Sequence, residues 1–216
     1  MTFRWKIAQA AEIRWWQRYL KNKPTADYAV WKTDYWQKLL AEIGLSDLNT
    51  EGGQKSILDA GCGPAGIFMI FKKQKVDALD PLLDEYEAIL PHFKKSFYPN
   101  VQFYSQPLES FDKQDVYDAI FCLNAINHVA DFARCFDILV AAAKKGGQLI
   151  VSIDAHNFLL LKHIFHASAC SRPPEPSSKI FIKRSIFQKT LQINGVFIEF
   201  PLFLKLSFQF FVATST

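Results

Sequence analysis

A glycine-rich turn and a distant aspartate form the clearest chemical pattern in this sequence. The stretch ILDAGCGPAGIF, residues 57–68, places G-x-G-x-x-G directly after a short apolar run. Such glycines let the backbone approach a ligand, and a helix expected from about Ala65 to Lys73 would offer its first amides to a negative group. Asp80 ends the next apolar run, where a carboxylate is suited to bind two ribose hydroxyls. The pattern predicts a ligand with an adenosine end.

Asp59 narrows the choice of ligand. It lies two residues before Gly61, where a carboxylate facing the turn would repel the pyrophosphate of a nicotinamide dinucleotide. It would suit S-adenosylmethionine, whose ammonium and sulfonium are cationic and whose carboxylate could lie on the turn amides. Simpler interpretations stay open, since Asp59 could orient the turn by accepting backbone hydrogen bonds and Asp80 could be a turn residue before Pro81. A nicotinamide oxidoreductase is the least favoured function.

The elements that must position these residues alternate from Ser56 onward. Buried strands are predicted at SILDA, KVDALD, VQFYSQ, YDAIFCLN and QLIVSID. Helices are predicted at 84–93 and at 131–145, the second with Lys144 and Lys145 in its last turn and glycine beyond it. A helix with Ser185 as its cap and Leu191 facing inward follows, and VFIEF and SFQFFVAT are expected to pair antiparallel. This order is typical of an α/β fold, a parallel sheet with helices on both faces, and the predicted domain spans 51–216.

Residues 1–50 are predicted to form a helical extension. All five tryptophans lie in this segment, in two helical runs separated by Pro24, with Thr25 as a cap and Gly44 as a terminator of the second run. Two interpretations stay open. The aromatic face could simply pack on the main domain, or part of it could close over an apolar substrate.

Composition limits the classes of partner and compartment. The chain has 216 residues, half of them hydrophobic, and a net charge of +4, which excludes a disordered chain. Its lysines occur as isolated pairs without the clustering of a nucleic-acid surface, so nucleic acid is an unlikely partner. Four cysteines without paired spacing predict reduced thiols. We expect a cytoplasmic protein without membrane insertion, and the oligomeric state is left open.

Four motifs together resemble the class I S-adenosylmethionine-dependent methyltransferases, particularly the UbiE-like or type 11 group. They are ILDAGCGPAG, VDALDP, YDAIFCLNAINHV and KKGGQLIVSID, and the resemblance covers about residues 55–212. It implies a Rossmann-like seven-stranded sheet of order 3-2-1-4-5-7-6 with strand 7 antiparallel, and S-adenosylmethionine as the cofactor. The implied cofactor residues are Asp59, Gly61, Cys62 and Gly63 along the methionine end, Asp80 on the ribose, Pro81, Leu82, Pro107 and Leu108 around the adenine, and Asn124 beside both ligands.

One departure from the family pattern concerns the adenine. Many relatives carry an aspartate that reaches the adenine amino group where this chain has SQPLE. Gln106 or a backbone carbonyl would have to take that place.

Candidate residues on the acceptor side follow the fourth and fifth predicted strands, at the edge where such sheets bind ligands. They are Asn127, His128, Asp131, Asp154, His156 and Asn157. Methyl transfer from a sulfonium is an in-line displacement, and a base is needed only when the acceptor must lose a proton. His128 and His156 are the candidate bases, with Asn127 beside them, although His128 could equally cap a helix.

The segment after the fifth predicted strand offers two further interpretations. His156, His163, His166 and Cys170 have metal-ligating side chains, but their spacing is not a standard zinc pattern and no metal is predicted. Residues 158–178 are instead a candidate lid that, with the tryptophan-rich segment, would enclose an apolar acceptor.

The expected function is methyl transfer to a small acceptor, apolar or aromatic. An RNA or protein methyltransferase is the first alternative, disfavoured by scattered basic residues and by Asn124-Ala125-Ile126-Asn127 in place of an Asn-Pro-Pro-Tyr motif. A partner protein that binds S-adenosylmethionine without catalysis is the second. The intact glycine turn and its two aspartates disfavour that alternative.

Overall fold

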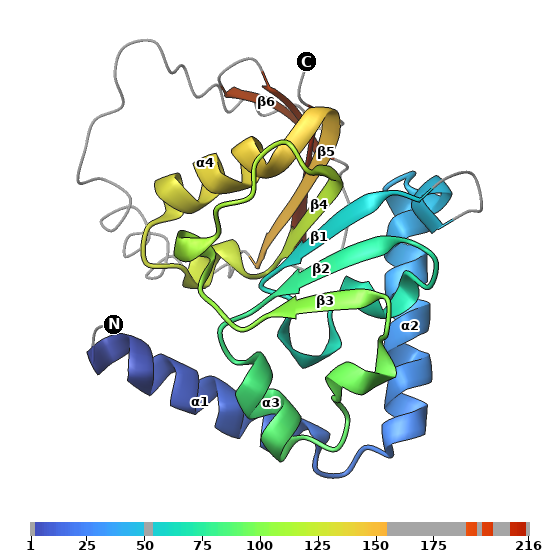
Figure 1. The fold of residues 1–216 in the computed structure, drawn as a ribbon, viewed down its shortest axis with the longest axis vertical. Coiled ribbons are helices and arrows are strands. Elements are labelled where there is room, and N and C mark those ends of the chain that lie inside the picture. Colours follow the sequence, from blue (N-terminus) through green and yellow to red (C-terminus); the bar gives the residue numbers. More distant parts are fainter. Residues whose placement is uncertain (1–2, 50–53, 155–188, 194–195, 201–207, 215–216) are drawn as a thin grey trace. The chain divides into compact units, whose positions relative to one another are not determined.

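A computed structural model describes residues 3–49, 54–154, 189–193, 196–200 and 208–214 (Figure 1). The chain divides into two compact units, Met1–Ser110 and Phe111–Thr216. The predicted division near residue 50 stays a prediction, as does the lid over residues 158–178, which lies outside the described residues.

The first unit is built on three parallel strands, in the order β3-β2-β1 (Figure 1). They are β1 (Ser56–Ala60), β2 (Lys75–Leu79) and β3 (Val101–Tyr104). All three coincide with predicted strands. The last four residues of β1 are buried, as the unbroken apolar run predicts for a strand covered on both faces. Because the strands are parallel, Asp59 and Asp80 come to the same edge of the sheet.

The α-helix predicted after β1 is wrong. In its place are two short 3₁₀ turns, η2 (Gly63–Ala65) and η3 (Ile67–Ile70), with Gly66 extended between them. The cause is Asp59, whose Oδ2 accepts a hydrogen bond from the Phe68 N–H at 3.0 Å and holds this segment against β1. The expectation that a helix start would present free amides to a negative group therefore fails here.

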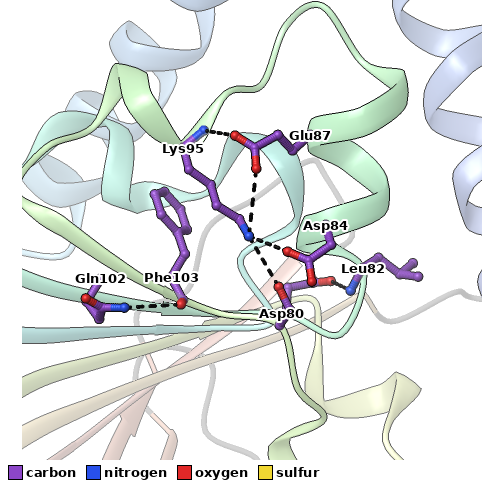
Figure 2. Close-up of polar contacts among 8 residues, drawn as sticks. Asp80, Leu82, Asp84, Glu87, Lys95, Gln102 and Phe103 are labelled. Carbon is purple, nitrogen blue, oxygen red and sulfur yellow. Dashed lines mark hydrogen bonds and ion pairs between the residues drawn. The ribbon is translucent and has the colours of Figure 1, made fainter.

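The helix after β2 is shorter than predicted. It is α3 (Leu83–Ile89), and Leu90 is already extended because Pro91 follows it. Lys95, in the turn η4 (Lys95–Phe97), forms ion pairs with Asp84 and Glu87 of α3 (Figure 2). These contacts fix α3 against the segment that leads into β3.

Two helices precede the sheet, as predicted. They are α1 (Phe3–Leu20) and α2 (Thr25–Glu42), followed by the turn η1 (Ser46–Asn49). The prediction that Thr25 caps the second helix is wrong, because Pro24 occupies the cap position and no side chain caps it. Gly44 adopts φ +72° just beyond α2, the left-handed conformation that ends a helix. No helix among the described residues is both long and apolar enough to cross a membrane.

Both helices pack on the rest of the first unit through aromatic side chains. The Tyr86 hydroxyl of α3 donates a hydrogen bond to Glu12 of α1 at 2.9 Å. Trp16 lies edge-on to the same tyrosine ring, with 6.3 Å between the centroids. On α2, the buried Trp36 indole donates to the Ala65 carbonyl at 3.0 Å. The aromatic face is thus attached directly to the glycine turn.

The second unit has its own strands, in the order β4-β5-β8-β7-β6. Strands β4 (Tyr117–Leu123) and β5 (Ala143–Asp154) are parallel, whereas β8 (Phe208–Thr214) pairs antiparallel with β5 and with β7 (Val196–Phe200). The helix predicted through Leu191 is wrong, since Lys189–Ile193 form β6 in an antiparallel pair with β7. The implied seven-strand order stays a prediction.

The turn η5 (Leu108–Ser110) precedes β4. Between β4 and β5 lie the turn η6 (Ile126–His128) and the helix α4 (Phe132–Ala142). Asp131 caps α4 by accepting a hydrogen bond from the Arg134 N–H at 3.0 Å. Lys144 and Lys145 were expected in the last helical turn. They belong to β5 instead, because the chain is already extended at Ala143.

Candidate functional site

Two buried carboxylates mark the candidate cofactor site in the first unit. The exposed fractions of Asp59 and Asp80 are 2% and 7%. Asp59 accepts from the backbone of η3, as described above. Asp80 accepts from the Leu82 N–H at 2.9 Å (Figure 2). Its other oxygen accepts from the Gly63 N–H at 3.0 Å. Both simpler roles considered from the sequence, turn orientation and turn formation, are therefore present in the structure.

The glycine turn curls over the end of β2. The N–H groups of Gly61 and Cys62 both donate to the Leu79 carbonyl, at 2.7 and 3.1 Å. Gly61 and Gly63 adopt φ +70° and +56°, values that favour glycine. A Cβ atom on Gly66 would overlap Asp59 Oδ2 and lie 2.7 Å from the Cys62 carbonyl oxygen. Gly61 and Gly63 are thus required for their backbone conformation, and Gly66 is required because no Cβ atom fits there.

The two carboxyl groups are costly to ionise. Burial is the main cause that raises the pKa of Asp59 and of Asp80 to about 7 each. Backbone hydrogen bonds oppose the shift, whereas repulsion from Asp80 adds to it at Asp59 and repulsion from Glu12 adds to it at Asp80. Burial also raises the pKa of the Cys62 thiol between them, so that thiol stays protonated. A cationic ligand arm at this position would stabilise the ionised carboxylates.

We expect the ligand-free protein to lose stability as the pH rises from 5.5 to 7.5. The ordinary pKa of both carboxyl groups is 3.8, and the folded values are about 7, so the folded state holds more protons in this interval. The free energy of unfolding must then fall with pH, by about 1–2 kcal/mol for each carboxyl group. Urea unfolding at several pH values measures this decline.

The Asp80→Asn variant isolates the contribution of one carboxyl group from that of every other titrating group. Its stability should fall less steeply with pH than that of the unchanged protein. Parallel pH profiles for the two proteins would contradict the assignment.

The predicted adenine residues lie at the same edge of the first unit. The Asp80 N–H donates to the Tyr104 carbonyl at 3.1 Å, which brings the ends of β2 and β3 together. Pro81 and Leu82 follow β2 directly, and Pro107 and Leu108 follow β3. The Gln106 amide donates to the Ser110 carbonyl at 3.3 Å, so its nitrogen is engaged within its own loop. The adenine and ribose candidates are thus brought to one edge.

The acceptor-side candidates of the second unit differ from one another in burial and in hydrogen bonding. Asn124 ends β4 with φ +55°, and its N–H donates to the Ser152 carbonyl at 2.9 Å. Asn127 has a buried side-chain oxygen, Oδ1, with no hydrogen-bond partner among the described residues. His128 is exposed, and the Asp131 carboxylate is already used as a helix cap.

Asp154, the last residue of β5, is paired with Phe208 of β8. His156, Asn157 and the residues considered as a metal group, His163, His166 and Cys170, lie outside the described residues. Within the described ranges there is no cluster of three or more metal-ligating side chains.

Sequence reasoning missed the side chains that α1 and α2 bring to the glycine turn. Trp16 lies against Gly63, where an added Cβ atom would be 3.7 Å from the indole ring. Trp36 contacts Ala65 as described, and Lys32 lies one helical turn before Trp36 with its ammonium 4.3 Å from the centroid of that ring. The four-residue spacing of Lys32 and Trp36 indicates that they share one face of a helix. It does not indicate which segment of the chain that face contacts.

The arrangement suits an adenosyl ligand with a cationic arm better than a dinucleotide. The amides of Ile67 and Phe68, which a pyrophosphate would need, already donate to Asp59. Asp59 also places negative charge directly behind Gly66. Asp80 retains acceptor capacity, since a carboxylate can accept about four hydrogen bonds and two are used. The residues present therefore fit S-adenosylmethionine.

Comparison with known proteins identifies the family. The family model described as "Methyltransferase domain" matches residues 28–188, well over half of the chain. The ubiquinone biosynthesis O-methyltransferase of Rickettsia conorii is 28% identical over 134 residues, which are 59% of this chain and 46% of that protein. The same enzyme of Rickettsia akari is 29% identical over 98 residues, 44% of this chain and 39% of that protein. This chain thus spans less than half the length of these curated relatives.

Two solved structures share the fold at low sequence identity. One is the Burkholderia thailandensis 1,6-didemethyltoxoflavin-N1-methyltransferase with bound S-adenosylhomocysteine (TM-score 0.53, 12% identity, 97% of this chain and 86% of that one). The other is the Synechocystis magnesium protoporphyrin IX methyltransferase with bound S-adenosylhomocysteine (TM-score 0.50, 14% identity, 85% of this chain and 83% of that one). They show that the fold is Rossmann-like. With the family match, they establish that the chain belongs to the class I S-adenosylmethionine-dependent methyltransferases.

Proposed function

We propose that this chain transfers a methyl group from S-adenosylmethionine to a small acceptor, apolar or aromatic, with an oxygen atom as the nucleophile. The observation that carries the proposal is the pair of buried carboxylates, Asp59 and Asp80, around a glycine turn most of whose amides are occupied. That environment favours a ligand that brings positive charge. The acceptor class is supported by the relatives, whose names describe methyltransferases of small molecules, two of them O-methyltransferases of ubiquinone biosynthesis.

The cofactor residues have distinct roles in this proposal. Asp80 accepts hydrogen bonds from the ribose hydroxyls with its remaining lone pairs, and Asp59 faces the methionine ammonium. Gly61, Cys62 and Gly63 lie along the methionine arm, where the positive φ of the two glycines lets the backbone approach the ligand closely. The adenine contacts Pro81, Leu82, Pro107 and Leu108, and Asn124 borders the cofactor and the acceptor. We also propose that the sheet has the family's seven-strand order, 3-2-1-4-5-7-6, with strand 7 antiparallel.

When bound, the cofactor supplies a methyl group on a sulfonium, which is an excellent leaving group. The chain's own residues have to align the acceptor and exclude water. Asn127 suits this task, since its unpartnered Oδ1 would accept a hydrogen bond from an acceptor hydroxyl. His128 and His156 are the proposed bases that remove the hydroxyl proton as the methyl group is transferred. The protein is proposed to act in the cytoplasm.

An acceptor made of RNA is not favoured, because lysines of the predicted pairs are engaged within the chain. Lys144 lies 3.0 Å from Asp118, and Lys95 lies 3.9 Å from Glu87. Lys94 donates to the Glu87 carbonyl. Lys144 and Lys95 thus neutralise local carboxylates, and Lys94 is engaged by a backbone carbonyl, so these three lysines are already used within the chain rather than offered to a phosphate backbone.

A methyl-transfer assay with labelled S-adenosylmethionine and a panel of hydroxylated aromatic compounds tests the function. We expect product with at least one phenol or catechol. Asn127→Ala and His128→Ala should each lower kcat/KM by about tenfold or more, with unchanged S-adenosylhomocysteine affinity. Transfer to RNA or protein alone would contradict the acceptor class. Full activity of both variants would remove Asn127 and His128 from the proposed machinery.

A further inference from the structure

The backbone amides of the glycine turn are largely used by the protein itself. Gly61 and Cys62 donate to Leu79, and Gly63 donates to Asp80. Phe68 donates to Asp59, and Pro64 has no N–H to offer. A cofactor carboxylate placed on these amides would have to break bonds that shape the turn. The amino-acid arm of S-adenosylmethionine ends in both an ammonium and a carboxylate, so the carboxylate needs a different partner.

Lys32 of α2 supplies a positive charge beside this turn. Its ammonium lies over aromatic rings, 4.3 Å from the Trp36 centroid and 4.7 Å from the Tyr35 centroid. Among the described residues, no oxygen atom accepts a hydrogen bond from this ammonium and no carboxylate lies within ion-pair distance of it. The aromatic rings attract the charge but satisfy none of its three N–H donors. The lysine therefore has the capacity to bind an anionic group.

The position of Lys32 is fixed relative to the cofactor loop. Trp36, on which the ammonium rests, donates its indole N–H to the Ala65 carbonyl at 3.0 Å. Burial lowers the pKa of Lys32 to about 8, and attraction to Asp59 opposes that shift. The lysine is thus within electrostatic range of the carboxylate assigned to the methionine end. A cation and an anion near the same turn complement the two charges of an amino-acid group.

We propose that the Lys32 ammonium binds the carboxylate of the methionine arm of S-adenosylmethionine, while Asp59 faces the ammonium of the same arm. The inference rests on the proposed function, and it makes α2 a part of the cofactor site. It also gives a reason for the aromatic residues of α2, because Tyr35 and Trp36 hold the lysine side chain above the turn.

Two ligands separate the carboxylate from the rest of the cofactor. S-adenosylhomocysteine carries both the amine and the carboxylate, and its decarboxylated analogue keeps the amine alone. By calorimetry, Lys32→Met should bind S-adenosylhomocysteine about tenfold more weakly than the unchanged protein, and the analogue within about twofold. Lys32→Arg should recover part of the lost affinity, because it restores the charge.

Lys38→Met is the matched control. This lysine is on the same helix, is 70% exposed, and pairs with Asp34 at 2.6 Å, so its loss should leave both affinities unchanged. Equal weakening of the two ligands in Lys32→Met would overturn the proposal, since Lys32 would then act through Asp59 or through the fold. Unchanged affinity for S-adenosylhomocysteine would overturn it as well. If the unchanged protein binds neither ligand, the proposed function itself fails.

Discussion

Asp80→Asn is expected to weaken S-adenosylhomocysteine binding by about 10- to 100-fold, because a hydrogen bond to a charged group contributes about 1.5–3 kcal/mol. The amide keeps the size of the carboxylate but can accept with one oxygen only. The carboxylate now accepts hydrogen bonds from both the Leu82 N–H and the Gly63 N–H. The single amide oxygen would have to divide its lone pairs between these groups and a ribose hydroxyl. Equilibrium dialysis with labelled S-adenosylhomocysteine measures the loss.

The ligand-free variant should remain folded at pH 8, because the relief from burying an ionised carboxylate offsets the loss of an acceptor for one of the two backbone N–H groups. Asp84→Asn is the matched control, since it makes the same change four residues further on. Its side chain is 68% exposed and pairs with Lys95 (Figure 2). We expect it to bind the ligand normally. Normal binding by Asp80→Asn would contradict the assignment of Asp80 to the ribose.

Gly66→Ala is expected to destabilise the protein by about 3 kcal/mol, which corresponds to a fall in Tm of about 6–12 °C. The added Cβ atom would overlap Asp59 Oδ2 and lie 2.7 and 2.8 Å from the Cys62 oxygen and Cβ atoms. None of these neighbours is the end of a flexible side chain in open space, because Asp59 and Cys62 are both buried. The clash must displace either the carboxylate or the turn. Differential scanning calorimetry of the two proteins measures the shift.

Gly44→Ala provides the comparison, because this glycine has φ +72° and no heavy atom within 4 Å of an added Cβ. Only backbone strain opposes that substitution, at a cost of about 1 kcal/mol. Gly66→Ala should therefore be clearly the more damaging of the two. Equal effects would show that space behind Gly66 is not limiting and that Asp59 does not fix the turn.

The first five strands, β1 to β5, were predictable because their apolar runs are short, continuous and bounded by turn residues. Each of the first five predicted strands overlaps an observed one. The helices were less predictable, since tertiary contacts decide where they stop. Pro91 shortened α3, and the hydrogen bonds of Asp59 replaced a helix after β1 with 3₁₀ turns. A local pattern does not show that a side chain in the preceding strand will capture the amides of the next segment.

The candidate site was predictable where residues adjacent in sequence make it. The glycine turn follows β1 and Asp80 follows the neighbouring strand β2, so their meeting follows from the parallel pairing of these two strands. Lys32, Trp36 and Trp16 were not predictable as site residues, because helix packing alone brings them to the turn. The tryptophans were visible in the sequence, but their target was not. Asn124 with φ +55° is an intermediate case, as asparagine commonly adopts that conformation.

The central claim is that the carboxyl ends of β1 and β2 bind an adenosyl ligand with a cationic arm. Calorimetric titration of the unchanged protein with S-adenosylmethionine, S-adenosylhomocysteine and NADH tests it most directly. The account predicts micromolar binding of both sulfur ligands, with one site per chain and no heat from NADH. Binding of NADH, or no binding of either sulfur ligand, would contradict the account.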